Sequence, residues 1–150
     1  MTISSDWVAR FTECFKGTSV LGAEVGAQTT YRVGGSASLE VIVESEEELD
    51  SLVEAWELSG RPEVYVLGAG SNTLVLEGGF DGVVIKLGER FSSIEATDGL
   101  VDLGGALMLP VAARRLSALG LRGLEWAVGV PGTVGGAVRM NAGGHGSEIS

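Results

Sequence analysis

Lysine, histidine and cysteine are nearly absent from this sequence. Lysine occurs only at Lys16 and Lys86, and 20 acidic residues against 10 basic ones give a formal net charge of −10. Nucleic acids and anionic membranes bind clustered cations, so this balance argues against both as partners. The single histidine, His145, excludes a histidine-based triad and a multi-histidine metal site, and the single cysteine, Cys14, excludes an internal disulfide framework.

Long apolar runs are missing as well. No run approaches the roughly 18 apolar residues of a membrane span. The first residues, MTISSDWVARF, include Asp6 and lack the apolar segment of a signal peptide. We therefore expect a cytoplasmic protein. A length of 150 residues matches one ordinary domain, and 45% hydrophobic residues can fill its core.

Glycine is the residue in excess. There are 24 glycines among 150 residues, against an average near ~7%. Eight of them lie in the stretch 123–146, GLEWAVGVPGTVGGAVRMNAGGHG, which contains one arginine and no lysine. The glycines show no period of three, so a loop-rich or ligand-cradling fold is favoured over a fibrous one.

The first half of the chain alternates strand and helix patterns. Residues 5–16 are predicted to form a helix that buries one apolar face, and 29–35 an extended segment that ends in a glycine turn. Residues 38–44 and 64–68 have the composition of strands. Between those strands, Ser45 and Glu48 form a capping box at the start of a helix. That helix turns Leu49, Leu52, Val53 and Trp56 to one face and stops at Gly60 and Pro62. This order of strand, helix and strand predicts a parallel pair within 38–68.

The second half has an antiparallel character. A strand is predicted over 83–88, followed by a hairpin over 91–105 that turns at Asp98-Gly99. A helix over 110–120 is expected to turn Val111, Leu116 and Leu119 inward and to end at Gly120. The change of pattern predicts two small α+β lobes that meet near 78–82, the first covering about 1–79 and the second about 80–150.

Two glycine-rich segments are candidate binding loops. The first, LGAGSNT, directly follows a predicted strand, and its successive backbone N–H groups are suited to form a concave anion site. It is not a Rossmann fingerprint, because Thr73 replaces the third glycine and no helix pattern follows. The candidate residues of this segment are Leu67, Gly68, Ala69, Gly70, Ser71, Asn72 and Thr73.

The second segment lies in the glycine-rich stretch itself. Its candidate residues are Gly129, Val130, Pro131, Gly132, Thr133, Val134, Gly135 and Gly136. Loops from separate lobes would grip the two ends of an extended ligand, or both sides of a pyrophosphate. With so few lysines, backbone N–H and hydroxyl groups must supply most of the donors. The alternative is that these glycines only serve tight turns. His145, Arg139 and Arg32 remain open between ligand contacts and structural roles.

Three stretches, in order, resemble the flavin-binding region of the UDP-N-acetylenolpyruvoylglucosamine reductase family. They are TTYRVGGSASLEVIVESEEEL, VLGAGSNTLVLEGGFDGVVIKLG and GLEWAVGVPGTVGGAVRMNAGGHGSEIS. The resemblance covers roughly residues 22–150. It implies a two-lobed FAD-binding domain of the vanillyl-alcohol-oxidase (PCMH) type. The first lobe would have parallel strands and helices, and the second would be mainly antiparallel.

The resemblance also implies where FAD would lie. The segments 67–72 and 129–137 would line its pyrophosphate and ribityl chain, and Asn141, Ala142 and Gly143 would approach it from the MNAGG motif. Some relatives in the wider fold attach flavin through a histidine near the first loop. None occurs there in this sequence, so the FAD is expected to be noncovalent.

The implied activity is a reduction in peptidoglycan synthesis. NADPH would supply hydride through FAD to a UDP-sugar enolpyruvyl ether, giving UDP-N-acetylmuramate. The family's catalytic arginine, serine and glutamate have no counterpart here, so we expect a truncated form that lacks the C-terminal substrate domain, is a monomer and is inactive alone. Two alternatives remain open: another noncovalent FAD oxidoreductase of this fold, and a nucleotide-binding module without catalysis.

Overall fold

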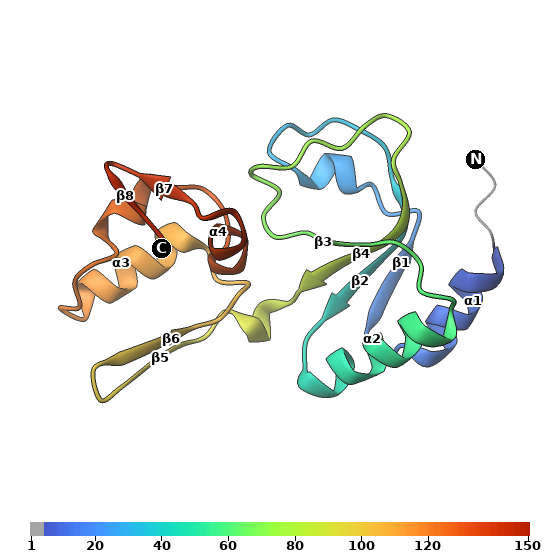
Figure 1. Cartoon of the computed structure of the whole chain (residues 1–150), viewed down its shortest axis with the longest axis horizontal. Helices are drawn as coiled ribbons and strands as arrows, with labels where there is room; N and C mark the ends of the chain where they lie inside the picture. Colours follow the sequence, from blue (N-terminus) through green and yellow to red (C-terminus); the bar gives the residue numbers. More distant parts are fainter. Residues whose placement is uncertain (1–4) are drawn as a thin grey trace.

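The computed structural model describes residues 5–150, which form two lobes joined by the segment 88–93 (Figure 1). Lobe one contains α1 (Ser5–Cys14), β1 (Thr18–Leu21), η1 (Val25–Gln28), β2 (Ala37–Val43), α2 (Glu46–Leu58), β3 (Val64–Val66) and β4 (Phe80–Leu87). After η2 (Glu89–Phe91), lobe two contains β5 (Ile94–Thr97), β6 (Leu100–Leu103), α3 (Leu109–Ala118), η3 (Glu125–Gly129), α4 (Val134–Met140), β7 (Gly143–Gly144) and β8 (Ser147–Glu148).

Lobe one is built on a four-stranded sheet in the order β1-β2-β4-β3. β2, β4 and β3 are parallel, and β1 runs antiparallel at the edge. The expected parallel pair within 38–68 is wrong in one respect, because β4 lies between β2 and β3 and pairs with both. Strand β4 carries the continuous apolar run VVI, and Val83 and Val84 are buried. A strand covered on both faces is suited to the centre of a sheet.

Helices α1 and α2 cover one face of this sheet (Figure 1). The expected helix over 5–16 is confirmed, although it ends at Cys14, which is half-buried. The helix after Ser45 is confirmed as α2, but Val53 is 58% exposed and does not face the core as expected. The core between helices and sheet contains Val8, Phe11, Phe15, Leu39, Val41, Val43, Leu52, Ala55 and Val83.

The start of α2 follows the predicted capping pattern with one shift. The Ser45 hydroxyl accepts a hydrogen bond from Glu48 N at 3.2 Å, as a capping box requires. The Glu48 carboxylate accepts from Glu44 N at 2.6 Å rather than from Ser45 N. Gly60, with φ +86°, follows the C-terminus of the helix as expected.

The segment 29–35 is an irregular loop and not the extended segment predicted from its sequence. Arg32 and Gly34 have φ of +53° and +105°, which turn the chain sharply. Long-range bonds hold this conformation: Gly35 N donates to Leu76 O at 2.8 Å, and Phe80 N donates to Ser36 O at 3.0 Å. Because the partners Leu76 and Phe80 lie far along the chain, local propensity did not reveal the loop.

Lobe two begins with the predicted hairpin. Strands β5 and β6 are antiparallel, and Asp98 and Gly99 both have positive φ, of +52° and +82°, as a tight two-residue turn requires. The helix predicted over 110–120 is confirmed as α3, and Gly120 follows it with φ +77°. Leu119, expected to face inward, is 64% exposed. The lobe's core is helical and contains Leu109, Ala113, Ala127 and Ala137, whereas its paired strands are antiparallel.

The boundary between the lobes differs from the expected position near residues 78–82. Strand β4 is central to the sheet of lobe one, so that lobe extends to Leu87 rather than to residue 79. Within residues 5–150, none of the helices has the length and apolar character needed to cross a membrane.

Candidate functional site: two glycine-rich segments in contact

The two predicted glycine-rich segments meet in space. The Ser71 hydroxyl of the first donates to Pro131 O of the second at 3.3 Å. A Cβ built on Gly68 would lie 2.6 Å from Thr133 Oγ1, and one on Gly132 would lie 2.9 Å from Ser71 Oγ. Real Cβ atoms essentially never approach so closely, so glycine at these positions permits the contact between the lobes.

Residues 67–73 form a loop directly after β3, as predicted. Leu67 N donates to Ile85 O at 2.9 Å, which fixes the start of the loop against β4. Gly70 has φ +66°, its carbonyl accepts from Thr30 N at 3.1 Å, and a Cβ there would lie 2.8 Å from Thr29 Cα. The loop continues into irregular backbone rather than a helix, which agrees with the rejection of a Rossmann fingerprint.

The backbone of this loop keeps donors available. Across residues 5–150, no acceptor is found for the N–H groups of Gly68, Ala69, Gly70, Ser71 and Asn72. On the facing segment, the same holds for the N–H groups of Gly132 and Thr133. Backbone donors in folded proteins are rarely left unpaired unless water or a ligand receives them. The contact between the segments therefore brings together backbone N–H groups that are able to donate hydrogen bonds to an anion.

The second segment is only partly a loop. Residues 134–140 form α4, so the expected loop over 129–136 ends at Thr133. Thr133 caps this helix, because its hydroxyl accepts from Gly136 N at 3.2 Å. Val134 N donates to Leu107 O at 2.8 Å and Gly135 N to Gly105 O at 3.0 Å. The first-turn amides of α4 are thus already paired within lobe two.

Asn141, Ala142 and Gly143 lie at the other end of α4, about 10 Å from Thr133 along the helix axis. Asn141 adopts φ +45°, and its amide group donates to Glu148 at 3.3 Å and accepts from Ser150 N at 3.1 Å. Ala142 N donates to Ala137 O at 2.8 Å. These contacts tie the β7–β8 hairpin to α4, and within residues 5–150 no hydrogen bond joins this group to residues 67–73.

The three residues left open by the sequence are all exposed. His145 lies in the turn of the β7–β8 hairpin with φ +54°, and a Cβ on Gly129 would lie 3.6 Å from its Nε2. Arg139 lies in the last turn of α4, and Arg32 in the loop over 29–35. The salt bridge found within residues 5–150 joins Arg61 and Glu57, so neither of these arginines is ion-paired to a carboxylate in the described part of the chain.

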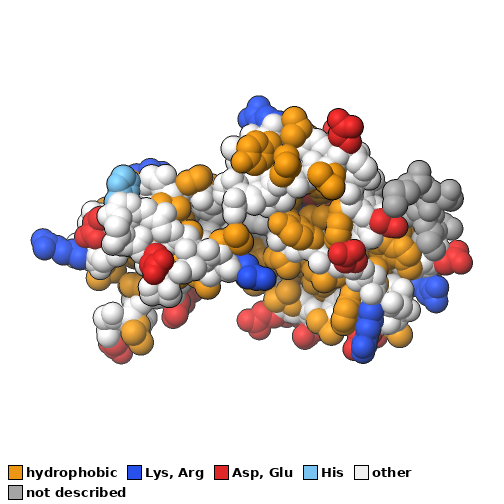
Figure 2. Space-filling model, turned by 45° about the horizontal axis from the view of Figure 1, so that its top comes forward, with side chains coloured by type: hydrophobic (Ala, Val, Ile, Leu, Met, Phe, Trp, Pro, Cys, Tyr) orange, Lys and Arg blue, Asp and Glu red, His pale blue; other side chains and the backbone are white. Residues whose placement is uncertain are grey.

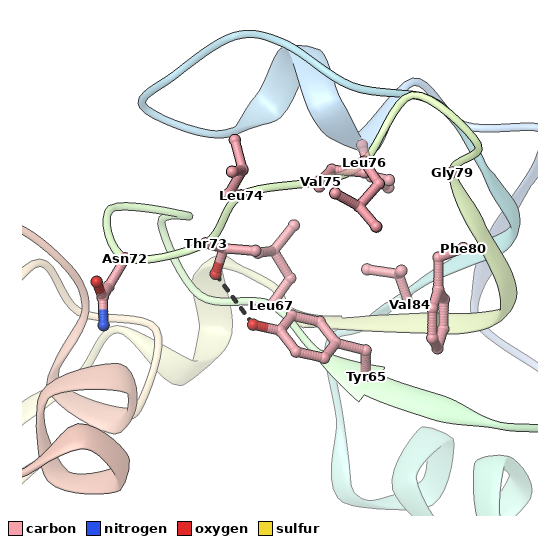
Figure 3. Close-up of a pocket in the computed structure, with 11 residues that line it drawn as sticks. Tyr65, Leu67, Asn72, Thr73, Leu74, Val75, Leu76, Gly79, Phe80 and Val84 are labelled. Carbon is pink, nitrogen blue, oxygen red and sulfur yellow. Dashed lines mark hydrogen bonds between the residues drawn. The ribbon is translucent and has the colours of Figure 1, made fainter.

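An apolar groove adjoins the first loop. It has a volume of ≈ 330 Å³ and is lined by Val25, Tyr65, Leu67, Asn72, Thr73, Leu74, Val75, Leu76, Gly79, Phe80 and Val84 (Figure 3). Leu74 and Leu76 are 62% and 73% exposed. Figure 2 shows hydrophobic side chains gathered on this part of lobe one. Since Asn72 and Thr73 belong to both features, the groove and the amide-rich loop are continuous.

Charged groups near the two segments are sparse. Lys86 Nζ donates to Gln28 Oε1 at 2.7 Å, close to the residues that pack on Gly70. In η3, which leads into the second segment, hydrogen bonds from its own backbone N–H and then from Gly123 N lower the pKa of Glu125. No cluster of three metal-ligating side chains occurs within residues 5–150.

The sequence did not reveal several residues that shape the site. Thr29 packs on Gly70, and Thr30 N donates to the Gly70 carbonyl. Gly105 O accepts from the start of α4, and the Tyr65 hydroxyl contacts that of Thr73. No local sequence pattern indicates these residues, because each contact joins two separate segments of the folded chain. The TTYRVGG motif was the one available signal for Thr29 and Thr30.

Comparison with known proteins shows the family of this chain. Residues 37–150 match a protein family described as "FAD binding domain". The chain belongs to this family of FAD-binding domains. UDP-N-acetylenolpyruvoylglucosamine reductase from Phenylobacterium zucineum (strain HLK1) is 46% identical over 121 residues, which are 80% of this chain and 40% of that relative. The chain therefore spans less than half the length of this relative.

Solved structures support the same fold. The crystal structure of UDP-N-acetylenolpyruvylglucosamine reductase (MurB) from Thermus caldophilus matches 89% of this chain and 45% of its own chain, with a TM-score of 0.71 and 37% identity. Physcomitrella patens BBE-like 1 variant D396N matches 75% of this chain and 26% of its own, with a TM-score of 0.55 and 14% identity, a likeness of fold alone. The two-lobed FAD-binding fold and the resemblance to the reductase family, both expected from the sequence, are confirmed.

Proposed function

We propose that this FAD-binding domain is the cofactor-binding part of a flavin- and NADPH-dependent reductase. The whole protein would convert UDP-N-acetylglucosamine enolpyruvate to UDP-N-acetylmuramate in peptidoglycan synthesis. The observation that carries the proposal is the contact of Gly68 and Ser71 with Thr133 and Pro131, which brings the unpaired amides of two segments together. Family membership and the named reductase relatives support the choice of cofactor and substrate.

The residues present fit a dinucleotide with a diphosphate at its centre. The amides of Gly68, Ala69, Gly70, Ser71 and Asn72 would hold the diphosphate from lobe one, and those of Gly132 and Thr133 from lobe two. The Ser71 hydroxyl already donates to Pro131 O, and the Thr73 hydroxyl lies 3.0 Å from that of Tyr65, so the backbone amides would be the main donors to the diphosphate. The part of the second segment in α4 would support this cradle by packing, because its first-turn amides are already paired.

FAD, when bound, supplies hydride transfer between NADPH and the enolpyruvyl double bond. The chain's own contribution is to bind the cofactor noncovalently, since residues 67–73 contain no histidine for a covalent link. We also propose a cytoplasmic monomer that takes no part in nucleic-acid binding, in keeping with a net charge of −10. Contacts with the UDP-sugar are proposed for the whole protein.

Binding by the purified chain tests this proposal. We expect FAD to bind with a change in flavin absorbance and fluorescence, roughly ten-fold or more tightly than riboflavin, because riboflavin lacks the diphosphate. A folded chain that does not bind FAD would overturn the proposal. Equal affinity for FAD, NADPH and UDP-sugars would instead favour a nucleotide-binding module without catalysis.

A charge control separates amide from cation binding. Arg139→Gln removes the arginine of the glycine-rich stretch, which is exposed and lies outside the two contacting loops. We expect its FAD affinity to stay within about two-fold of the unsubstituted chain, because a surface charge beyond the contact contributes little. A loss of more than about ten-fold would place the diphosphate on this cation and contradict the amide cradle.

A further inference from the structure

Tyr65 stands between the sheet of lobe one and the loop that follows it. It is the middle residue of β3, the edge strand, where its register partner on β4 is Val84. Its side chain is 43% exposed and forms one wall of the apolar groove. The ring packs edge-on against Phe80, with centroids 6.2 Å apart and an interplanar angle of 63°. This contact and the strand backbone limit the directions in which the phenol can point.

The Tyr65 hydroxyl reaches the last residue of the amide-rich loop. It lies 3.0 Å from Thr73 Oγ1, and Figure 3 shows the two side chains turned toward each other across the groove. A phenol is a stronger acid than an aliphatic alcohol and hence the better donor. With Tyr65 donating, the Thr73 hydroxyl hydrogen is directed away from the phenol.

The loop is therefore held at four places. Leu67 N donates to Ile85 O at its start, and Thr30 N donates to Gly70 O in its middle. The Ser71 hydroxyl donates to Pro131 O across the lobes, and the hydroxyls of Thr73 and Tyr65 meet at its end. The residues between the two ends, Gly68 to Asn72, have no hydrogen bond from their own N–H groups to hold their conformation. Glycine at positions 68 and 70 makes this stretch conformationally permissive, so its ends matter for its shape.

We propose that Tyr65 is a positioning residue for the diphosphate of FAD, acting through Thr73. The phenol holds the end of the loop so that the amides of Gly68–Asn72 keep one arrangement before the cofactor arrives. This inference rests on the proposed function, since it concerns the same loop. A loop already in its binding arrangement loses less conformational entropy on binding, which raises affinity without a new contact.

The mechanism predicts a dependence on the phosphate groups of the ligand. Tyr65→Phe keeps the ring and its contact with Phe80 but removes the hydroxyl. We expect FAD affinity to fall roughly five-fold, the usual effect of one hydrogen bond, with riboflavin affinity within about two-fold of its original value. The thermal unfolding midpoint without ligand should stay close to that of the unsubstituted chain, because the bond is exposed.

Matched variants isolate the hydroxyl pair. Tyr31→Phe is the control, since Tyr31 is the other tyrosine, is 60% exposed and has no hydrogen bond found from its hydroxyl within residues 5–150. Thr73→Val should match the loss of Tyr65→Phe, and the double variant should lose no more than either alone. Thr73→Ser restores the hydroxyl and should rescue the affinity. Thr73→Val also measures the contact independently if Tyr65→Phe folds poorly.

The outcomes separate this inference from the proposed function. If the unsubstituted chain does not bind FAD, the proposed function fails, and the positioning role fails with it. If that chain binds FAD and Tyr65→Phe binds equally tightly, only the positioning role is overturned. Equal losses for FAD and riboflavin, together with a lower unfolding midpoint, would also overturn it, because they indicate a general structural role.

Discussion

The segments 67–73 and 129–136 are both rich in glycine, yet their backbones are used differently. In the first, the amides of Gly68 through Asn72 have no acceptor within residues 5–150. In the second, Val134, Gly135 and Gly136 donate to Leu107, Gly105 and Thr133. The first segment keeps its donors available, whereas the second keeps only those of Gly132 and Thr133 beside it and uses the amides of Val134, Gly135 and Gly136 to anchor a helix.

The difference teaches what glycine does in each place. Gly70 has a positive φ and packs against Thr29, so the residue shapes the loop. Gly135 lies inside α4, where a Cβ would approach Gly105 O at 3.1 Å, so the residue permits close packing of one backbone on another. Glycine density alone therefore does not identify the amides that meet a ligand. Pairing within the folded chain does.

The largest predicted effect is the loss of stability caused by a substitution in the first segment, residues 67–73. Gly70→Ala places a side chain at φ +66° and 2.8 Å from Thr29 Cα, which is backbone and cannot rotate away. We expect a loss of about 2–3 kcal/mol in the free energy of unfolding, from left-handed strain and overlap together. Urea unfolding measures the loss, and FAD titration should show weaker binding.

Gly78→Ala is the control for this change. Gly78 follows the same loop, has no atom within 4 Å of its Cβ position and is not in the left-handed region. We expect its stability to change by about 0.5 kcal/mol or less. If Gly70→Ala were as stable as Gly78→Ala, the shape of the loop would not depend on glycine at position 70.

A smaller effect is expected in the second segment. Thr133→Ala removes the hydroxyl that caps α4 through Gly136 N. The expected loss is about 1 kcal/mol of unfolding free energy, typical of a lost N-cap. Thr133→Ser keeps the hydroxyl and should retain most of the stability. A Thr133→Ala variant with unchanged urea unfolding would show that the start of α4 does not need its cap.

The smallest expected effect is on stability in acid, and it can be measured at one glutamate in each lobe. Hydrogen bonds from its own N–H and then from Gly123 N lower the pKa of Glu125 below its ordinary value of 4.5. A group with a lowered folded pKa stabilises the fold above its ordinary pKa, and this contribution is lost as the pH falls through the folded value. Glu125→Gln should therefore flatten the acid side of the stability profile slightly, as measured by thermal unfolding between about pH 3 and pH 7.

Glu47 offers the same test in lobe one. Its own N–H and then the Ser45 hydroxyl lower its pKa, at the first turn of α2. Glu47→Gln should also reduce the loss of stability in acid. An increase in acid sensitivity for either variant would contradict the direction of these shifts.

Local sequence patterns predicted the elements but not all of their neighbours. The capped helix α2, the hairpin at Asp98-Gly99 and the glycine stop at Gly120 each depend on residues within a few positions, and each was found as expected. The place of β4 between β2 and β3 was missed, because β4 pairs with residues of β2 that lie more than 40 positions earlier in the chain. Burial of Leu119 was also predicted wrongly, since periodicity cannot tell where α3 leaves the core.

For the site, the sequence indicated both glycine segments and suggested that amides would replace cations. It did not indicate which amides remain available, because that depends on acceptors such as Leu107 O and Gly105 O in other segments. The assignment of Asn141, Ala142 and Gly143 to the cofactor remains a prediction. Their observed contacts lie within the C-terminal hairpin and α4.

By itself, the sequence determined the family, the two-lobed character and the shortage of cations that leaves backbone amides as the main donors. Only the tertiary structure decided that Ser71 meets Pro131, that Thr133 caps α4, and that Tyr65 reaches Thr73. The physical reason is that a residue's own chemistry and its near neighbours set turns and helices. Whether a backbone N–H is paired depends on an acceptor that folding brings from elsewhere in the chain.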